Sequence, residues 1–136
     1  MQLLVPSTYP LNVMIYNLNH WSIEVKWQPP AIPNGIITEY AIKYGTKIVD
    51  QSGNKTITVS NHNQSNSAVV SNLMNGTAYW LTIAAKTSVG RGPFAPTIDF
   101  VVRDGGIFTQ FYNQYLFQMN CIYFMLPVHL FHNVVI

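Results

Sequence analysis

Residues 22–44 read SIEVKWQPPAIPNGIITEYAIKY and contain two runs of alternating apolar and polar residues joined by a proline-rich turn. In the first run, Ile23, Val25 and Trp27 alternate with polar residues, as in a strand with one buried face. The prolines at 29 and 30 end this run, because proline cannot donate a hydrogen bond to a neighbouring strand. The turn Pro33-Asn34-Gly35 then reverses the chain.

The second run predicts another strand, because every second residue from Thr38 to Tyr44 is suited to the same buried face. Similar runs occur on either side of this pair, separated by turn residues. They lie around residues 11–15, 55–60, 68–73, 79–86 and 98–102. Seven short strands within about 100 residues predict an all-β fold, a sandwich of two antiparallel sheets.

Four segments in this order resemble the landmarks of the fibronectin type III domain family. They are Val25–Pro30, Pro33–Tyr40, Leu73–Tyr79 and Ala84–Pro93. The resemblance covers roughly Tyr9 to Arg103 and implies a seven-stranded, immunoglobulin-like antiparallel sandwich. In such a fold Trp27 fills the space between the sheets, and Tyr79 occupies the position of the tyrosine corner. We expect these core residues: Trp27, Tyr40, Ile42, Leu73, Tyr79, Leu81 and Ile83.

Composition excludes several classes of protein. Charged residues make up 9% of the 136 residues and the net charge is +2, which argues against a nucleic-acid-binding protein that relies on phosphate contacts. One cysteine cannot form an internal disulfide. The first residues, Met1–Pro6, lack the basic and apolar regions of a signal peptide. If the domain is extracellular, we therefore expect that this chain is a fragment or that its true start lies upstream.

The chain divides near Asp104, because all its charged residues lie between Glu24 and Asp104. We expect an N-terminal lead-in at residues 1–8, the domain at 9–104 and an uncharged apolar tail at 105–136 that is not part of the domain. A membrane-spanning helix needs about 20 mainly apolar residues, and polar residues and a proline interrupt the stretch 115–131. We interpret the tail as an alternative or read-through terminus, with membrane association as the second interpretation.

Motifs for catalysis and cofactor binding are weak. Gly90-Arg91-Gly92 resembles half of a phosphate loop, but it joins two predicted strands and no helix follows. The same loop lacks the aspartate of an Arg-Gly-Asp integrin motif. His129 and His132 have no third ligand at a suitable spacing for zinc, and Cys121 has no basic neighbour to activate it. We expect no enzyme activity, no cofactor and no small-molecule substrate.

Three sequons for N-glycosylation occur in predicted loops or at strand edges. Their asparagines are Asn54, Asn63 and Asn75, followed two positions later by threonine or serine. Each is a candidate for modification if the protein is secreted.

The resemblance implies a non-catalytic binding or spacer module in an extracellular receptor or adhesion protein, with a protein partner or neighbouring domains of unknown identity. Trp80 is the preferred contact residue, because it alternates with Tyr79 and should point outward. Glu39 and Lys43 are candidates on a neighbouring strand of that sheet. The simpler interpretation is that Trp80 only covers the sheet. Two alternatives remain: a fragment of a receptor tyrosine phosphatase without its catalytic domain, and an intracellular cytoskeletal module.

Overall fold

The computed structural model describes residues 4–48, 53–103 and 109–111, which form eight β-strands. The strands are β1 (Leu11–Asn19), β2 (Ser22–Gln28), β3 (Glu39–Thr46), β4 (Lys55–Ser60), β5 (Ser67–Val70), β6 (Ala78–Lys86), β7 (Ile98–Val101) and β8 (Thr109–Phe111).

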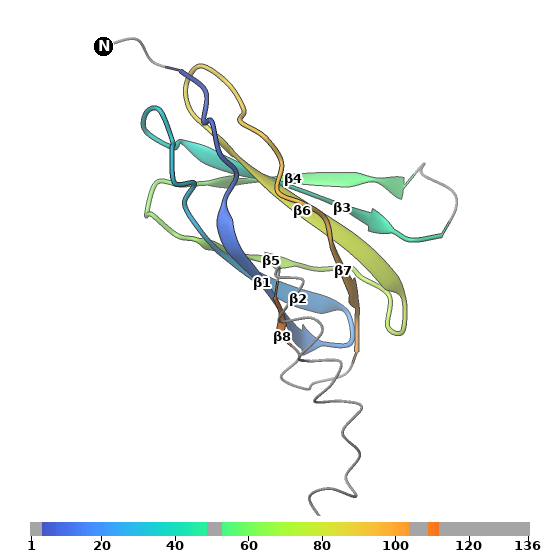
Figure 1. Cartoon of the computed structure of the whole chain (residues 1–136). Coiled ribbons are helices and arrows are strands. Elements are labelled where there is room, and N and C mark those ends of the chain that lie inside the picture. The colour runs from blue at the N-terminus through green and yellow to red at the C-terminus, as the bar shows by residue number, and fades with distance from the viewer. Residues whose placement is uncertain (1–3, 49–52, 104–108, 112–136) are drawn as a thin grey trace, which may run out of the picture.

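The strands form two antiparallel sheets packed face to face (Figure 1). One sheet has the order β5-β2-β1-β8 and the other has the order β4-β3-β6-β7. The first seven strands in chain order complete the predicted sandwich, and the predicted fold class is confirmed. The eighth strand, β8, adds to the free edge of β1.

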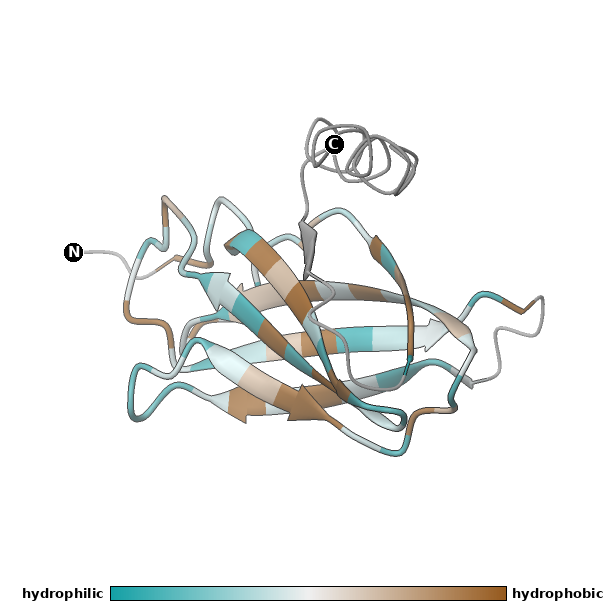
Figure 2. Ribbon diagram, turned by 90° about the horizontal axis from the view of Figure 1, so that it is seen from below, coloured by the Kyte–Doolittle hydropathy of each residue, from teal (hydrophilic) through white to brown (hydrophobic). Residues whose placement is uncertain are grey.

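Alternation along the strands produces one buried face on each sheet, as the ribbon coloured by hydropathy shows (Figure 2). In β2, Ile23, Val25 and Trp27 are buried while Lys26 and Gln28 are exposed. In β3 the pattern is less strict, since Ala41 on the opposite face is also buried. A strand with two covered faces indicates that the outer surface of this sheet is itself partly shielded.

The space between the sheets is filled by large side chains from both of them. Trp27 of β2 meets Tyr40 of β3 edge to face, with ring centroids 5.0 Å apart. Tyr79 of β6 stacks on Phe100 of β7 at 5.6 Å. The structure places all the residues expected in the core in buried positions: Trp27, Tyr40, Ile42, Leu73, Tyr79, Leu81 and Ile83.

Tyr79 also anchors the crossing from one sheet to the other between β5 and β6. Its hydroxyl oxygen accepts a hydrogen bond of 3.0 Å from the backbone N–H of Met74, five residues upstream. The turn in this loop places Gly76 at φ +74°, a conformation that glycine adopts without steric cost. The N–H of Gly76 donates to the carbonyl of Val102, which attaches the loop to the end of β7.

The lead-in before β1 packs against the sandwich. The N–H groups of Leu4 and Ser7 donate to carbonyls of the β2–β3 loop, at Asn34 and Ile32. Pro6 is fully buried, and a Cβ atom on Gly92 would lie 2.7 Å from the Pro6 carbonyl oxygen. The described part of the lead-in, from Leu4 onward, thus lies beside the β6–β7 connection (Figure 1).

The predicted tail contributes β8, whose Gln110 pairs with Ile15 of β1. The remaining tail residues, 105–108 and 112–136, lie outside the described part of the chain, and so do Cys121, His129 and His132. The domain boundary at residue 104 therefore stays a prediction. No helix long and apolar enough to cross a membrane occurs among the residues that the structure describes.

Candidate protein-contact surface

The candidate contact residues lie on the outer face of the sheet β4-β3-β6-β7. In the strand register Gly45 of β3 is opposite Trp80 of β6, and Trp80 is opposite Asp99 of β7. Asn54 immediately precedes β4, whose first residue, Lys55, pairs with Tyr44. The row Asn54, Gly45, Trp80 and Asp99 thus crosses the whole sheet; we call it the Trp80 row.

Trp80 lies outside the core and is partly exposed. Its indole covers the backbone of Gly45, because a Cβ atom on Gly45 would approach both Cζ2 and Nε1 of Trp80 to 3.2 Å. Because Gly45 has no side chain, the indole can lie directly over its backbone. Trp80 shields the sheet and at the same time presents aromatic surface to solvent.

Two ion pairs lie on this sheet, one at the Trp80 row and one farther along β3 and β6. Lys47, just after β3, forms an ion pair with Asp99 of β7. Glu39 forms an ion pair with Lys86 across β3 and β6. Both pairs are partly exposed, so each contributes at most about 1 kcal/mol to stability. Because Glu39 is already paired within the sheet, it is less available to a partner than its sequence position implied.

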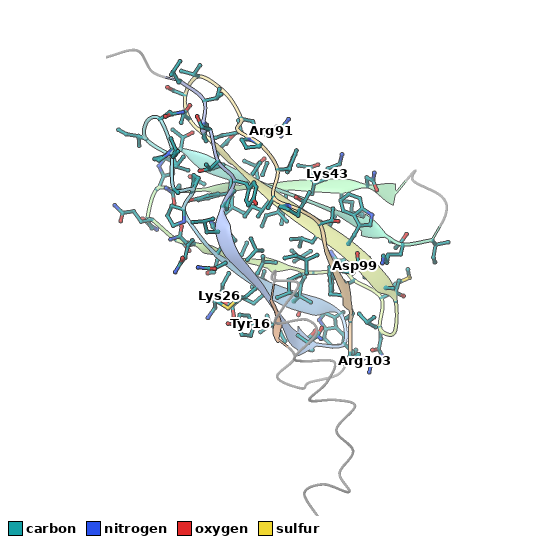
Figure 3. The ribbon with its side chains drawn as sticks, in the orientation of Figure 1. Tyr16, Lys26, Lys43, Arg91, Asp99 and Arg103 are labelled. Atoms are coloured by element: carbon teal, nitrogen blue, oxygen red, sulfur yellow. The ribbon has the colours of Figure 1, made fainter. Side chains whose placement is uncertain are left out.

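Lys43 differs from the paired Lys47 and Lys86 of this sheet. It faces Thr82 in the register, and within residues 4–48, 53–103 and 109–111 no carboxylate lies within ion-pair distance of it. Figure 3 shows Lys43 and Asp99 on this sheet, away from the Tyr16 and Lys26 pair of the other sheet. Lys43 therefore places a cation on the outer face of the sheet, two residues from Gly45 and thus close to Trp80.

The other sheet has an outer surface of a different kind. The ammonium of Lys26 lies 5.3 Å from the ring centroid of Tyr16 and 3.8 Å from a carboxylate oxygen of Glu24. Tyr16 also donates a weak 3.4 Å hydrogen bond to the sulfur of Met14. These side chains are engaged with one another, which makes this face a suitable comparison surface for the Trp80 row.

Sequence reasoning missed Trp21, in the turn between β1 and β2. Its side chain is 50% exposed, and His20 approaches its ring edge-on at 3.9 Å. The carbonyl of Trp21 accepts a hydrogen bond from the N–H of Leu73, which places the turn beside the exposed Met74. A tryptophan in a polar Asn-His-Trp-Ser turn, outside any alternating run, was the signal available in the sequence.

A hollow of about 530 Å³ lies at one end of the sandwich, between the β2–β3 and β4–β5 loops. Pro29, Tyr40, Asn61 and His62 contribute to its lining. The hydroxyl of Tyr40 and Oδ1 of Asn61 are buried without a hydrogen-bond partner among the described residues. Burial raises the pKa of Tyr40, while the nearby indole N–H of Trp27 acts in the opposite direction.

The three sequon asparagines, Asn54, Asn63 and Asn75, are all exposed. Asn63 lies in the β4–β5 loop and Asn75 at the turn before β6, whereas Asn54 belongs to the Trp80 row. Among the described residues there is no group of three histidine, cysteine, aspartate or glutamate side chains that could hold a metal ion.

Similar proteins include several receptors. Over 78 residues the chain is 45% identical to ephrin type-A receptor 7 of Gallus gallus, and this match covers 57% of the chain. Over 96 residues, or 71% of the chain, it is 32% identical to ephrin type-B receptor 5 of Gallus gallus. The matched segments are 8% and 9% of these two receptors, so the chain spans less than a tenth of their length.

Solved structures show the same fold. The human contactin 1 fn3 domain is 26% identical to this chain with a TM-score of 0.63, and the match covers 74% of this chain and 82% of that domain. The third fibronectin III domain of another human protein gives a TM-score of 0.66 at 22% identity over 77% and 89%. Residues 8–101 match the family model for the fibronectin type III domain. The chain belongs to the fibronectin type III domain family, as its sequence landmarks predicted.

Proposed function

We propose that this chain is a non-catalytic binding or spacer module of an extracellular, cell-surface receptor or adhesion protein. Its family membership and its similarity to ephrin receptors and to a contactin 1 domain support this proposal. The module places a rigid sandwich between neighbouring domains and presents one sheet face to a protein partner. The receptor-phosphatase and cytoskeletal alternatives have no comparable support in these relatives.

The Trp80 row carries the contact proposal. Trp80 is a large aromatic residue that remains partly exposed, and Lys43 supplies a cation without an internal partner among the described residues. Protein interfaces concentrate their binding energy in a few residues, among which tryptophan is enriched. A partner with an acidic rim and an apolar pocket would complement this surface.

The first test is the effect of Trp80→Ala on binding. The whole chain, secreted behind an added signal peptide and freed of N-linked glycans by a glycosidase, is applied to cells that express a candidate receptor, and bound protein is counted by flow cytometry. We expect at least a tenfold loss of affinity, which corresponds to about 1.4 kcal/mol, and a smaller loss for Lys43→Ala.

The matched control is Tyr16→Ala on the opposite sheet, which should leave binding unchanged. Melting temperatures of all variants must show that each domain remains folded. If Tyr16→Ala weakens binding as much as Trp80→Ala does, the contact does not lie on the Trp80 row.

The extracellular location has its own test. The secreted chain is treated with a glycosidase that removes N-linked glycans, and its electrophoretic mobility is compared before and after treatment. We expect a shift from glycans at one or more of Asn54, Asn63 and Asn75. The absence of any shift would show that none of the three sequons is used, and the extracellular proposal would lose their support.

A further inference from the structure

Asn54 and Trp80 approach the same point on the outer face of the sheet. A Cβ atom built on Gly45 would lie 2.5 Å from Oδ1 of Asn54 and 3.2 Å from two atoms of the Trp80 indole. The Asn54 carboxamide is therefore a close neighbour of the indole across the glycine. With any other residue at 45, a side chain would stand between them.

We propose that an N-linked glycan on Asn54 packs against Trp80, so that the glycan covers the Trp80 row and excludes a protein partner from it. This inference rests on the extracellular location given in the proposed function. It assigns N-glycosylation to Asn54. Occupancy of this sequon then determines whether the contact surface is accessible to a protein partner.

The modification requires an accessible acceptor. Asn54 and Thr56, the first and third residues of the sequon, are both exposed. The donor is an oligosaccharide carried on a lipid pyrophosphate. A new bond joins Nδ2 of Asn54 to the anomeric carbon of the first N-acetylglucosamine, the bond from that carbon to the pyrophosphate oxygen breaks, and the amide loses one proton as the lipid pyrophosphate leaves.

Space for the first sugar exists beside the sheet. A Cβ atom placed on Gly53 would meet no described atom within 4 Å, so the chain just before Asn54 is open to solvent on that side. Trp80 retains exposed surface after covering Gly45. In the proposed arrangement the first sugar, attached to the exposed Asn54, lies over the exposed part of the indole.

The contact has a physical basis in the sugar and in its attachment. An N-acetylglucosamine ring presents C–H groups on one face, which can bury apolar area against an aromatic ring. Such a contact is weak between separate molecules, but the covalent link makes it intramolecular and raises the effective concentration to the millimolar range. The closeness of Asn54 to Trp80 is what allows this gain.

The other two sequons lack this arrangement. Asn63 and Asn75 lie in loops and have no place in a strand register beside Trp80. Glycans at these positions are expected to remain in solvent. Asn63, which is exposed like Asn54, provides the matched control.

The experiment compares glycoforms of the whole chain secreted from mammalian cells. Thr56→Ala removes the first sequon while keeping Asn54, and Asn63→Gln removes the second. Mass spectrometry of peptides measures occupancy at each asparagine. Hydroxyl-radical footprinting then measures the oxidation rate of Trp80, with the exposed Trp21 as an internal reference.

We expect Asn54 to be occupied and Trp80 to be oxidised at least threefold more slowly in the wild type than in Thr56→Ala, with Trp21 unchanged. Asn63→Gln should leave the Trp80 rate as it is. The Asn54 glycan should also raise the melting temperature by roughly 4 °C, and Trp80→Ala should abolish most of this increase.

Equal Trp80 oxidation with and without the Asn54 glycan would overturn the inference, and so would occupancy at Asn63 or Asn75 with none at Asn54. In both cases the extracellular assignment would stand. If no asparagine of the chain were occupied, the inference would fail and the extracellular assignment would lose the support of its sequons. A rise in melting temperature that persists in Trp80→Ala would show that the glycan acts without the indole.

Discussion

Two buried tyrosines of this domain have opposite hydrogen-bonding situations. The hydroxyl of Tyr79 accepts a hydrogen bond from the N–H of Met74, whereas the hydroxyl of Tyr40 has no partner among the described residues. Both rings are core residues with aromatic neighbours. Removal of the hydroxyl alone therefore separates the contribution of the hydrogen bond to the free energy of unfolding from the contribution of the packed ring.

Tyr79→Phe should lower the free energy of unfolding by about 1 kcal/mol, because the part-buried hydrogen bond from the N–H of Met74 is lost. For a domain of this size that corresponds to a fall in melting temperature of about 4–8 °C. Tyr40→Phe should cost less than Tyr79→Phe, since the Tyr40 hydroxyl makes no well-formed hydrogen bond and interacts only with the nearby Trp27 side chain. Urea denaturation of both variants measures these two changes in the free energy of unfolding. Equal losses in the two would contradict the assigned role of Tyr79.

At the scale of elements, glycines set how closely segments approach. Gly92 lies against the backbone of Pro6, so the β6–β7 connection and the lead-in contact each other without intervening side chains. Thr87 adds a hydrogen bond from its hydroxyl to the carbonyl of Leu4. The lead-in is thereby attached to the sandwich by tertiary contacts before β1 begins.

Gly92→Ala should detach the lead-in, because the new methyl group would clash with a backbone carbonyl that cannot rotate away. We expect a loss of about 1–3 kcal/mol and faster proteolysis of the first residues. Gly53→Ala is the control, since no described atom lies near its added methyl group. If both variants were equally stable, the contact with Pro6 would have no energetic role.

The pairing of β8 with β1 gives the predicted tail a testable link to the domain. Three residues of β8 pair with Met14, Ile15 and Tyr16. We expect residues 1–104 to fold cooperatively on their own, with faster amide hydrogen exchange in this part of β1 than in the full chain. If the shortened chain failed to fold, residues 105–136 would be structural and the boundary at 104 would be wrong.

For the molecule as a whole, buried tyrosines limit stability at alkaline pH. Burial raises the pKa of Tyr40 and of Tyr44, and the neighbouring Tyr79 adds to the rise at Tyr44. An unfolded tyrosine ionises near pH 10, whereas these two stay protonated in the folded domain at that pH. Their contribution to stability is therefore complete below about pH 10 and is lost as pH rises through the folded pKa values.

The measurement is the free energy of unfolding between pH 8 and pH 12, with tyrosinate absorbance followed in parallel. Stability should fall above about pH 10, and the fall should be shallower in Tyr40→Phe, which has one titrating group fewer. An unchanged slope in that variant would contradict burial as the cause.

Much of the fold followed from local pattern. Alternation around Trp27 and Tyr40 and the turn at Pro33-Asn34-Gly35 were enough to predict the strands and the sandwich, because a half-buried strand requires a period of two. Strand ends were less predictable: β1 extends to Asn19 and β5 ends at Val70, since pairing with a neighbour determines where a strand stops.

The sequence alone determined the family, the all-β class, the buried face of each strand and the outward position of Trp80, because these depend on the order and period of side chains. Only the tertiary structure decided that Gly45 lies beneath Trp80, that Asn54 adjoins both, and that Glu39 is paired with Lys86. These neighbours are far apart in the chain, and the register that joins them arises from packing of whole strands rather than from any local residue pattern.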